Sequence, residues 1–250
     1  MMKQFFIFSF LLGFSLMNGQ ATHDSIVVKQ PMKFNCKQLI IPTALMTYGV
    51  IGINSDRLKS INNNLRAGIT ENIDRKFTVD DYSRYVPALA VYGLNAFGIE
   101  GKHNLKDRSI ILGTSYLIAT STSLGLKALV KVERPDGSND NSFPSGHTAL
   151  AFASAEFLYQ EYKDVSIWYG VSGYIIAAGT GYFRIYNDKH WFNDVAMGAG
   201  IGILSTKIAY WIFPFVDKTL FKSKKNVSSA MVAPFYNGNQ MGVGMLINLK

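Results

Sequence analysis

Apolar residues in this chain gather into six segments separated by short polar stretches. The segments are Leu39–Ile53, Tyr85–Ile99, Ser109–Val130, His147–Tyr159, Val165–Phe183 and Val195–Val216. Those that begin at Ser109, Val165 and Val195 contain 19 to 22 residues and are nearly free of charge. That length is enough to cross a hydrocarbon layer of about 30 Å. The pattern therefore predicts an all-α fold, a helical bundle embedded in a membrane.

Two of the remaining stretches are less regular. Leu39–Ile53 is short, and Pro42 and two glycines interrupt it. After it, apolar residues recur at steps of three and four with polar residues between them, at Leu58, Ile61, Leu65, Ile69, Ile73 and Phe77. This spacing predicts an amphipathic helix. Two interpretations stay open: the helix lies on the bilayer surface and guides a lipid headgroup, or it packs on its own domain.

The two ends of the chain carry different signals. Met1–Ala21 resembles a secretory signal, with Lys3, an apolar run from Phe5 to Met17 and a small-residue cleavage site; the alternative is an uncleaved anchor. Near the other end, two short strands around Asn237-Gly238 predict a C-terminal β-hairpin. The expected regions are a signal peptide (1–21), a polar, short apolar and amphipathic segment (22–84), a catalytic helical core (85–216), and a basic linker with the hairpin (217–250).

The net charge limits the classes of partner to be expected, and the cysteine content excludes an internal disulfide. The 250 residues carry a formal net charge of +8, but the positive residues are scattered. Without a basic stripe interleaved with aromatic residues, nucleic acid is not an expected partner. An anionic substrate or a membrane surface explains the excess more simply. Cys36 is the only cysteine, so no internal disulfide is possible.

Candidate chemistry is confined to three short stretches. They are K-A-L-V-K-V-E-R-P from Lys127 to Pro135, P-S-G-H from Pro144 to His147, and R-I-Y-N-D-K-H-W-F-N-D from Arg184 to Asp194. In the first, Lys127 and Arg134 are seven residues apart, which predicts one face of a helix that Pro135 ends. Arginine holds two phosphate oxygens with its planar fork, whereas lysine acts as a point charge.

The second stretch reads as the start of a helix. Ser145 is the expected N-cap of the apolar run that follows His147. The free backbone N–H groups at such a helix end attract an anion. Gly146 lets the backbone approach that anion, and His147 is placed to donate a proton.

The third stretch pairs an imidazole with a carboxylate. His190 and Asp194 are four residues apart, so on one helical turn the carboxylate bonds one ring nitrogen and leaves the other free to attack. Arg184, six residues before His190, is expected to be a third phosphate ligand.

The order K-x6-R-P, then P-S-G-H, then R-x5-H-x3-D resembles the signature of the type 2 phosphatidic acid phosphatase (PAP2) superfamily. That family includes lipid phosphate phosphatases, bacterial class A acid phosphatases, glucose-6-phosphatase and vanadium haloperoxidases. The resemblance implies a PAP2-type helical bundle. Its helical core would extend over roughly Tyr85 to Val216.

The resemblance also assigns roles to residues. It implies His190 as a nucleophile that forms a phosphohistidine, Asp194 as its orienting carboxylate, and His147 as the acid and then the base. The implied phosphate ligands are Lys127, Arg134, Ser145, Gly146 and Arg184, with no metal and no cofactor. One position departs from the pattern: Phe183 stands where the family usually has serine.

The expected function is a metal-independent phosphatase acting on phosphomonoester or pyrophosphate groups of membrane lipids. Candidate substrates are lipid A, undecaprenyl pyrophosphate, phosphatidylglycerol phosphate and phosphatidic acid. The runs R-P-D-G-S and F-R-I-Y-N look most like lipid A phosphatases of gut-type bacteria. The alternatives are a soluble periplasmic acid phosphatase of broad specificity, a vanadium-dependent haloperoxidase, and a non-enzymatic membrane scaffold.

The expected location is the inner membrane, in a multi-pass chain whose site faces the periplasm. Lysines after the last apolar segment favour an inward C-terminus: Lys218, Lys222, Lys224 and Lys225. The stretch from Arg57 to Arg84 also carries six Lys and Arg residues, so charge alone does not settle the topology. The partners are therefore a phosphorylated lipid and the membrane.

Overall fold

The structure is a computed structural model that describes residues 34–71, 77–220, 229–236 and 241–248. From Leu220 onward it describes the backbone and not the side chains. The predicted signal peptide (1–21) lies outside the described residues, and so does the predicted turn at Asn237-Gly238.

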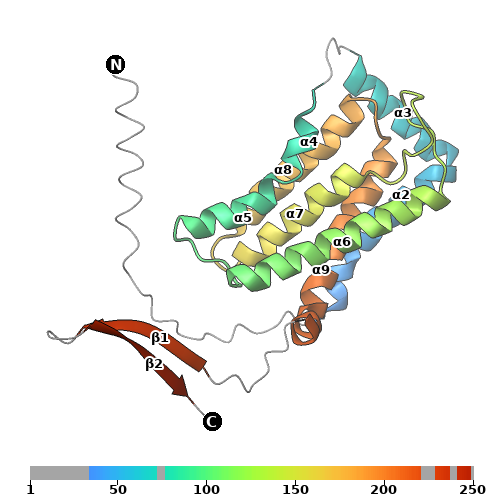
Figure 1. Cartoon of the computed structure of the whole chain (residues 1–250). Helices are drawn as coiled ribbons and strands as arrows, with labels where there is room; N and C mark the ends of the chain where they lie inside the picture. The colour runs from blue at the N-terminus through green and yellow to red at the C-terminus, as the bar shows by residue number, and fades with distance from the viewer. Residues whose placement is uncertain (1–33, 72–76, 221–228, 237–240, 249–250) are drawn as a thin grey trace, which may run out of the picture. The chain divides into compact units, whose positions relative to one another are not determined.

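The elements follow one another as a run of helices and then two strands (Figure 1). The helices are η1 (Cys36–Leu39, a 3-10 helix), α2 (Ile40–Asn54), α3 (Asp56–Thr70), α4 (Val79–Ser83), α5 (Val86–Ala96), α6 (Leu105–Leu129), α7 (Gly146–Tyr162), α8 (Ile167–Tyr186) and α9 (Phe192–Leu220). The strands β1 (Ser229–Tyr236) and β2 (Met241–Asn248) pair antiparallel, with Ser229 opposite Asn248. Because the connecting turn is not described, the hairpin stays a prediction. The part of the chain from 34 to 220 that is described is helical, as the apolar pattern predicts.

Helix α7 is the centre of the helical body. Ala149, Ala151, Ala153 and Ala155 are all completely buried. Residues two apart on a helix point to nearly opposite sides, so α7 is covered all round. It runs side by side with α6, α8 and α9 (Figure 1). Its far half joins the main core, where Phe157 and Tyr162 pack with residues of α5, α6 and α9.

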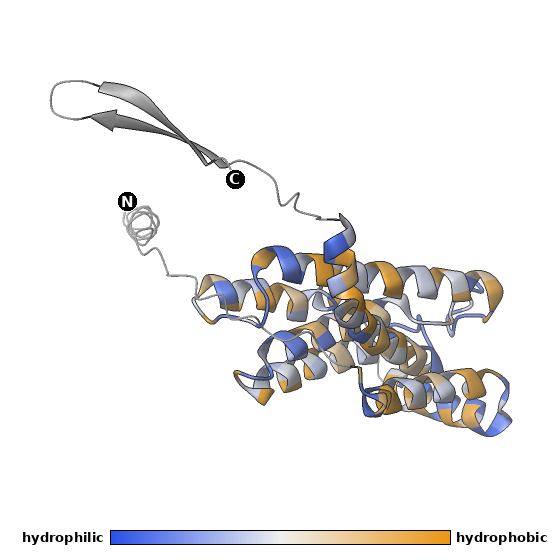
Figure 2. Cartoon of the chain, turned by 90° about the horizontal axis from the view of Figure 1, so that it is seen from below, coloured by the Kyte–Doolittle hydropathy of each residue, from blue (hydrophilic) through white to orange (hydrophobic). Residues whose placement is uncertain are grey.

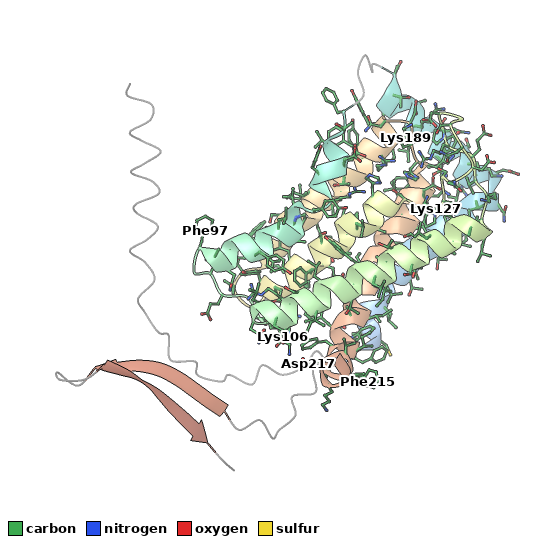
Figure 3. The ribbon with its side chains drawn as sticks, in the orientation of Figure 1. Phe97, Lys106, Lys127, Lys189, Phe215 and Asp217 are labelled. Atoms are coloured by element: carbon green, nitrogen blue, oxygen red, sulfur yellow. The ribbon has the colours of Figure 1, made fainter. Side chains whose placement is uncertain are left out.

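The connections bring four helix ends together. The end of α6, the start of α7, the end of α8 and the start of α9 carry the three motif stretches. In Figure 3, Lys127 and Lys189 lie at this end of the helical body, whereas Lys106 and Asp217 lie at the opposite end. The 2.9 Å ion pair between Lys106 and Asp217 ties α6 to α9 at that opposite end. Because successive helices alternate in direction, the three motif stretches between Lys127 and Asp194 lie at the same end of the helical body.

By length and composition the chain is a membrane protein. Among the described helices, Cys36–Asn54, Leu105–Leu129 and Phe192–Thr219 are long and apolar enough to cross a membrane. Large apolar side chains on these helices remain open to the outside, for example Ile41, Leu117 and Phe215 at 66%, 68% and 72% exposure. Figure 2 shows apolar residues along the helices of the body, with hydrophilic residues gathered at helix ends and loops. An apolar face of this size needs a covering, and lipid supplies it.

One expected span is revised, and one open segment is long enough to be a span. Leu39–Ile53, which the sequence left open, reaches span length because Pro42 falls in the first turn of α2, where a missing N–H is tolerated, and η1 lengthens the segment. The segment at Val165 becomes α8, which is not among the helices that meet the length and composition of a span. Its Gly, Ser, Thr and Tyr residues lower its hydropathy, and it packs instead against α7.

The amphipathic helix is confirmed in its first part. Helix α3 covers Leu58 to Ile69 and ends at Thr70, so Phe77 lies beyond it; Ile73 is outside the described residues. Its buried residue is polar: Asn62 donates to the side chain of Asn193 at 2.9 Å. Ile61 and Leu65 remain 40% and 41% exposed.

The close approach of α9 to α7 yields a stability prediction. A Cβ added at Gly202 would overlap the carbonyl oxygen of Ala149 and lie 2.8 Å from the amide nitrogen of Ala153. Both obstacles are backbone atoms and cannot rotate away, so Gly202→Ala must push the helices apart. We expect a loss of about 1–3 kcal/mol, typical of overpacking. Thermal unfolding in detergent checks this, with Gly113→Ala as control because a Cβ there meets open space.

Candidate active site

The P-S-G-H stretch forms the first turn of α7. Ser145 is its N-cap, as predicted, and the Ser145 side chain accepts a hydrogen bond from the Thr148 amide at 3.4 Å. The Ser145 amide donates to the carbonyl oxygen of Asp194 at 3.0 Å, which joins this turn to the start of α9. Around Gly146 a Cβ would meet nothing within 4 Å, so the backbone at the positive end of α7 is open to a ligand.

The first motif does not form one helix face, which corrects the sequence-based expectation. Helix α6 ends at Leu129, and Arg134 lies in the following loop rather than in a helix ended by Pro135. Val130 and Val132 take extended conformations, which suit β-branched residues, and Val132 forms a bridge with Asn141. Lys127 reaches the same loop, because its Nζ donates to the carbonyl oxygen of Asn141 at 2.6 Å.

The third motif places His190 in a loop and not on a helical turn with Asp194. The His190 amide donates to the carbonyl oxygen of Arg184 at 3.2 Å, which holds this loop against the end of α8. Asp194 lies in the first turn of α9, and its Oδ2 accepts from the Trp191 amide at 2.9 Å. The expected pairing is still present, since Nδ1 of His190 lies 3.5 Å from Oδ2 of Asp194. Such distances often shorten once a substrate is bound.

The positive charge of Arg184 affects both imidazoles of the candidate site. It is 8% exposed, and its Nη1 donates to Oδ2 of Asp80 at 2.5 Å. Burial lowers the pKa values of His147 and His190, and the positive charge of Arg184 lowers both further. Burial and the same charge lower the pKa of Arg134. The charge of Arg184 thus favours the neutral form of both imidazoles.

Two arginines of the candidate site each have a buried donor that lacks a partner. Among the described residues, no acceptor bonds the Nε atoms of Arg134 and Arg184, and both atoms are buried. Buried donors are almost always paired, so these two need an acceptor that the described protein atoms do not supply. The oxygens of a phosphate group satisfy guanidinium forks well.

The pKa of His190 gives a prediction on pH. Burial, opposed by Asp194 and assisted by Arg184 and Lys127, lowers the pKa of His190 to about 4. The neutral ring needed for attack is therefore present at pH 5 and is lost only as pH falls through about 4. We expect the acid limb of kcat/KM to lie near pH 4, after correction for ionisation of the substrate phosphate near pH 6. An acid limb near 6.5, the value of an ordinary histidine, would contradict this.

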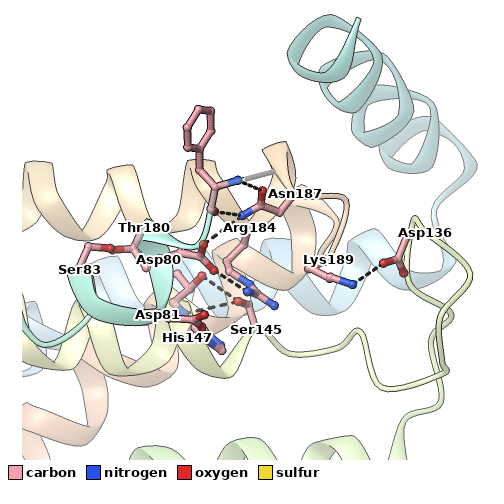
Figure 4. Close-up of polar contacts among 12 residues, drawn as sticks. Asp80, Asp81, Ser83, Asp136, Ser145, His147, Thr180, Arg184, Asn187 and Lys189 are labelled. Carbon is pink, nitrogen blue, oxygen red and sulfur yellow. Dashed lines mark hydrogen bonds and ion pairs between the residues drawn. The ribbon is translucent and has the colours of Figure 1, made fainter. Parts of the chain in front are cut away.

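Residues that the sequence did not single out complete the arrangement. Asp80 accepts a hydrogen bond from Arg184, and Oδ1 of Asp81 lies 2.8 Å from Nε2 of His147 (Figure 4). The Ser142 hydroxyl donates to Asp194. No spacing rule could have found Asp80 and Asp81, because they precede His147 by more than sixty residues. Phe183, the departure from the family pattern, packs its ring against Tyr182 and Tyr186.

One cluster among the described residues has the composition of a metal site: Asp80, Asp81 and His147. The two oxygens of Asp80 already accept hydrogen bonds from Arg184 and Asn187, at 2.5 and 3.0 Å. The guanidinium of Arg184 and the neutral amide of Asn187 thus already engage both oxygens of Asp80.

Together, these observations describe a helical membrane protein with a cluster of lysine and arginine side chains and two imidazoles at one end of its helical body. The sequence model described as "PAP2 superfamily" matches residues 108–218. This segment contains all the motif residues predicted from the sequence. The segment from 108 to 218 belongs to the PAP2 superfamily.

Two curated relatives are similar to parts of this chain. The lipid A 1-phosphatase of Porphyromonas gingivalis is 36% identical over 172 residues, which are 65% of this chain and 38% of that protein. The bacitracin transport permease protein BcrC of Bacillus licheniformis is 36% identical over 76 residues, 30% of this chain and 35% of that protein. The chain thus spans little more than a third of the length of either relative.

Two solved structures are also similar. LpxE of Aquifex aeolicus aligns with a TM-score of 0.46 and 25% identity, covering 60% of this chain and 94% of that one. The PAP2-type phosphatidylglycerolphosphate phosphatase of Bacillus subtilis aligns with a TM-score of 0.43 and 18% identity, covering 74% of this chain and 99% of that one.

Proposed function

We propose that this chain is a metal-independent phosphatase that removes a phosphate from a membrane lipid through a phosphohistidine. The observation that carries the proposal is the pair of buried guanidinium donors of Arg134 and Arg184 that lack an acceptor among the described residues, beside the imidazole of His190 paired with Asp194. An apolar ligand would leave them unsatisfied, and a cation would be repelled by them. A phosphoryl group, with charge spread over several oxygens, fits both their number and their sign.

In the first step His190 is the nucleophile. With Nδ1 directed to Asp194, Nε2 attacks the phosphorus, the P–N bond forms and the P–O bond to the lipid breaks. His147 gives a proton to the departing oxygen. Lys127, Arg134 and Arg184, with the backbone amide of Gly146, hold the phosphoryl oxygens. The amide of Ser145 already donates to Asp194, so Ser145 acts by capping and placing this turn.

In the second step water cleaves the phosphohistidine. His147, now neutral, takes a proton from the water as its oxygen attacks the phosphorus, and the P–N bond breaks. Inorganic phosphate leaves, and His190 and His147 return to their starting protonation states. The cations act in both steps because each passes through a similarly charged phosphoryl group.

The proposed membrane location and orientation rest on the two ends of α9. Its first turn lies in the site, and its other end leads into the lysine-rich stretch that begins at Lys218. The positive-inside tendency favours a cytoplasmic location for that stretch, which supports the proposal that the site faces the periplasm from the inner membrane. The side chains of the candidate spans that remain exposed favour this over the soluble acid phosphatase.

The first candidate substrate is the phosphate of lipid A, because a protein named lipid A 1-phosphatase is 36% identical to this chain over 172 residues. Undecaprenyl pyrophosphate, phosphatidylglycerol phosphate and phosphatidic acid are the other lipids to compare. All present a phosphate on an amphiphile, which a site near a membrane surface can receive.

The test is phosphate release by the full chain purified in detergent. The panel comprises the four lipids and a water-soluble phosphoester, each with a chelator present and with His190→Ala as control. We expect turnover of a lipid, its persistence in chelator and its loss in the variant. Activity on the soluble ester alone would point to the acid phosphatase, and loss in chelator would overturn the metal-independent reaction.

A further inference from the structure

The short helix α4 contributes two adjacent carboxylates to the site from outside the segment that matches the family. It covers Val79–Ser83, whereas the match begins at residue 108. Asp80 is 1% exposed, and the side chain of Asp81 is 48% exposed. Neighbours in sequence, they turn to different partners (Figure 4).

Helix α4 is fastened to the end of α8. Asp80 accepts from Nη1 of Arg184 at 2.5 Å and from the Asn187 amide at 3.0 Å. One turn away, the hydroxyls of Ser83 and Thr180 lie 2.8 Å apart. These contacts fix the backbone that carries Asp81, so its carboxylate is held in place although it is partly exposed.

Asp81 is hydrogen-bonded to His147, the proposed acid of the reaction. Its Oδ1 lies 2.8 Å from Nε2 of His147, and this hydrogen bond lowers the pKa of Asp81, which keeps it ionised. No hydrogen bond to Nδ1 of His147 occurs among the described residues. Nε2 is therefore engaged and Nδ1 is available.

The hydrogen bond from His147 to Asp81 matters because the cations near His147 favour loss of its proton. Burial lowers the pKa of His147, and the charges of Arg184 on α8 and Arg84 after α4 lower it further. The hydrogen bond to Asp81 and the charge of Asp80 act in the opposite direction. An acid must hold its proton at the working pH, and a site lined with cations works against that.

We propose that Asp81 is a positioning residue for the proton transfers of His147, holding Nε2–H so that Nδ1 gives and takes the proton. The role rests on the proposed function. In the first step the Nδ1–H bond breaks and an O–H bond forms on the departing alcohol. In the second step Nδ1 takes a proton from the attacking water. Throughout, Nε2–H stays hydrogen-bonded to Asp81, which stabilises the cationic ring and fixes its orientation.

A merely structural role makes a different prediction. An ion pair as exposed as Asp81 contributes little to stability, so its loss should leave the fold and the chemistry nearly unchanged. The test therefore measures quantities that a surface contact does not move: the pH profile and the dependence on the leaving group.

The variants are Asp81→Asn and Asp81→Glu in the full chain, with Asp217→Asn as the matched control. Asp217 forms an exposed 2.9 Å pair with Lys106 at the opposite end of the helical body (Figure 3). For a lipid phosphate, whose alcohol is a poor leaving group, we expect kcat of Asp81→Asn to fall roughly 10-fold or more, a share of the 10²–10⁴ that a general acid contributes. With a nitrophenyl phosphate, which leaves without protonation, the loss should be several-fold smaller.

The pH profile supplies the second readout. Without the carboxylate the pKa of His147 falls, so the alkaline limb of kcat should move to lower pH in Asp81→Asn and return in Asp81→Glu. Equal losses for both leaving groups, or an unmoved alkaline limb, would overturn the role of Asp81. If the wild type showed no turnover dependent on His190, the proposed function would fail, and this inference with it. Normal His190-dependent turnover with an unaffected Asp81→Asn would remove the inference alone.

Discussion

Replacement of His190 with glutamine is expected to reduce kcat by about 10⁴-fold or more, because the amide cannot form the covalent intermediate. His190 is 2% exposed and lies at the centre of the cations, so no neighbouring nucleophile can take its place without rearrangement. The measurement is phosphate release from the preferred lipid, with thermal unfolding to show that the variant folds. A variant that retained a tenth of the wild-type rate would exclude the nucleophilic role.

The same variant tests the intermediate directly. Rapid quenching of wild-type protein with labelled substrate should trap phosphate bound to protein through a bond that is labile to acid and stable to alkali. His190→Gln should trap none. His147→Gln should still be phosphorylated by an ester with a good leaving group, and its phosphoenzyme should decay slowly because no base activates water. Label retained in His190→Gln would place the covalent bond on another residue.

Replacement of Arg184 is expected to have the second largest effect. Arg184→Lys keeps a positive charge beside Asp80 but loses the planar fork, so we expect kcat/KM to fall about 100-fold or more while the protein remains folded. Arg184→Ala should also lose stability, by about 3–5 kcal/mol, since it leaves the buried carboxylate of Asp80 without its partner.

Two comparisons separate binding from folding. Asp80→Asn combined with Arg184→Ala should recover part of the stability and none of the activity. Arg66→Gln removes another arginine that pairs with an aspartate, since its Nε lies 2.8 Å from Oδ1 of Asp188 in the loop that precedes His190. That pair is half open to solvent, so its loss should change kcat/KM far less than Arg184→Lys. Equal effects of the two would indicate that Arg184 only supports the loop.

Local patterns were sufficient for the helices and for the chemical inventory. Ser145 caps α7 because the serine side chain and the start of the apolar run are adjacent in the chain, and the contact involves residues three apart. The PAP2 resemblance rested on residue types and spacing, and the match to residues 108–218 confirmed it. The amphipathic period of α3 likewise depends only on neighbours one turn apart.

Patterns failed where a distant partner overrode the local preference. Lys127 and Arg134 have the spacing of one helix face, yet the chain turns extended after Leu129 because Val132 pairs with Asn141. His190 leaves the helix that its spacing to Asp194 suggested, held by the carbonyl oxygen of Arg184. In each case the deciding hydrogen bond joins residues that a helical window does not connect.

The sequence alone was enough to single out the cations and imidazoles of the candidate site. The packing of the helices decided that they lie close together. Asp80 and Asp81 carry no motif, and only the docking of α4 on α8 brings them to Arg184 and His147. Hydrogen bonds and charges act over a few ångströms, while these partners are separated by 66 and 104 positions in the chain. A contact of that kind exists once the helices have packed and leaves no periodic trace in the sequence.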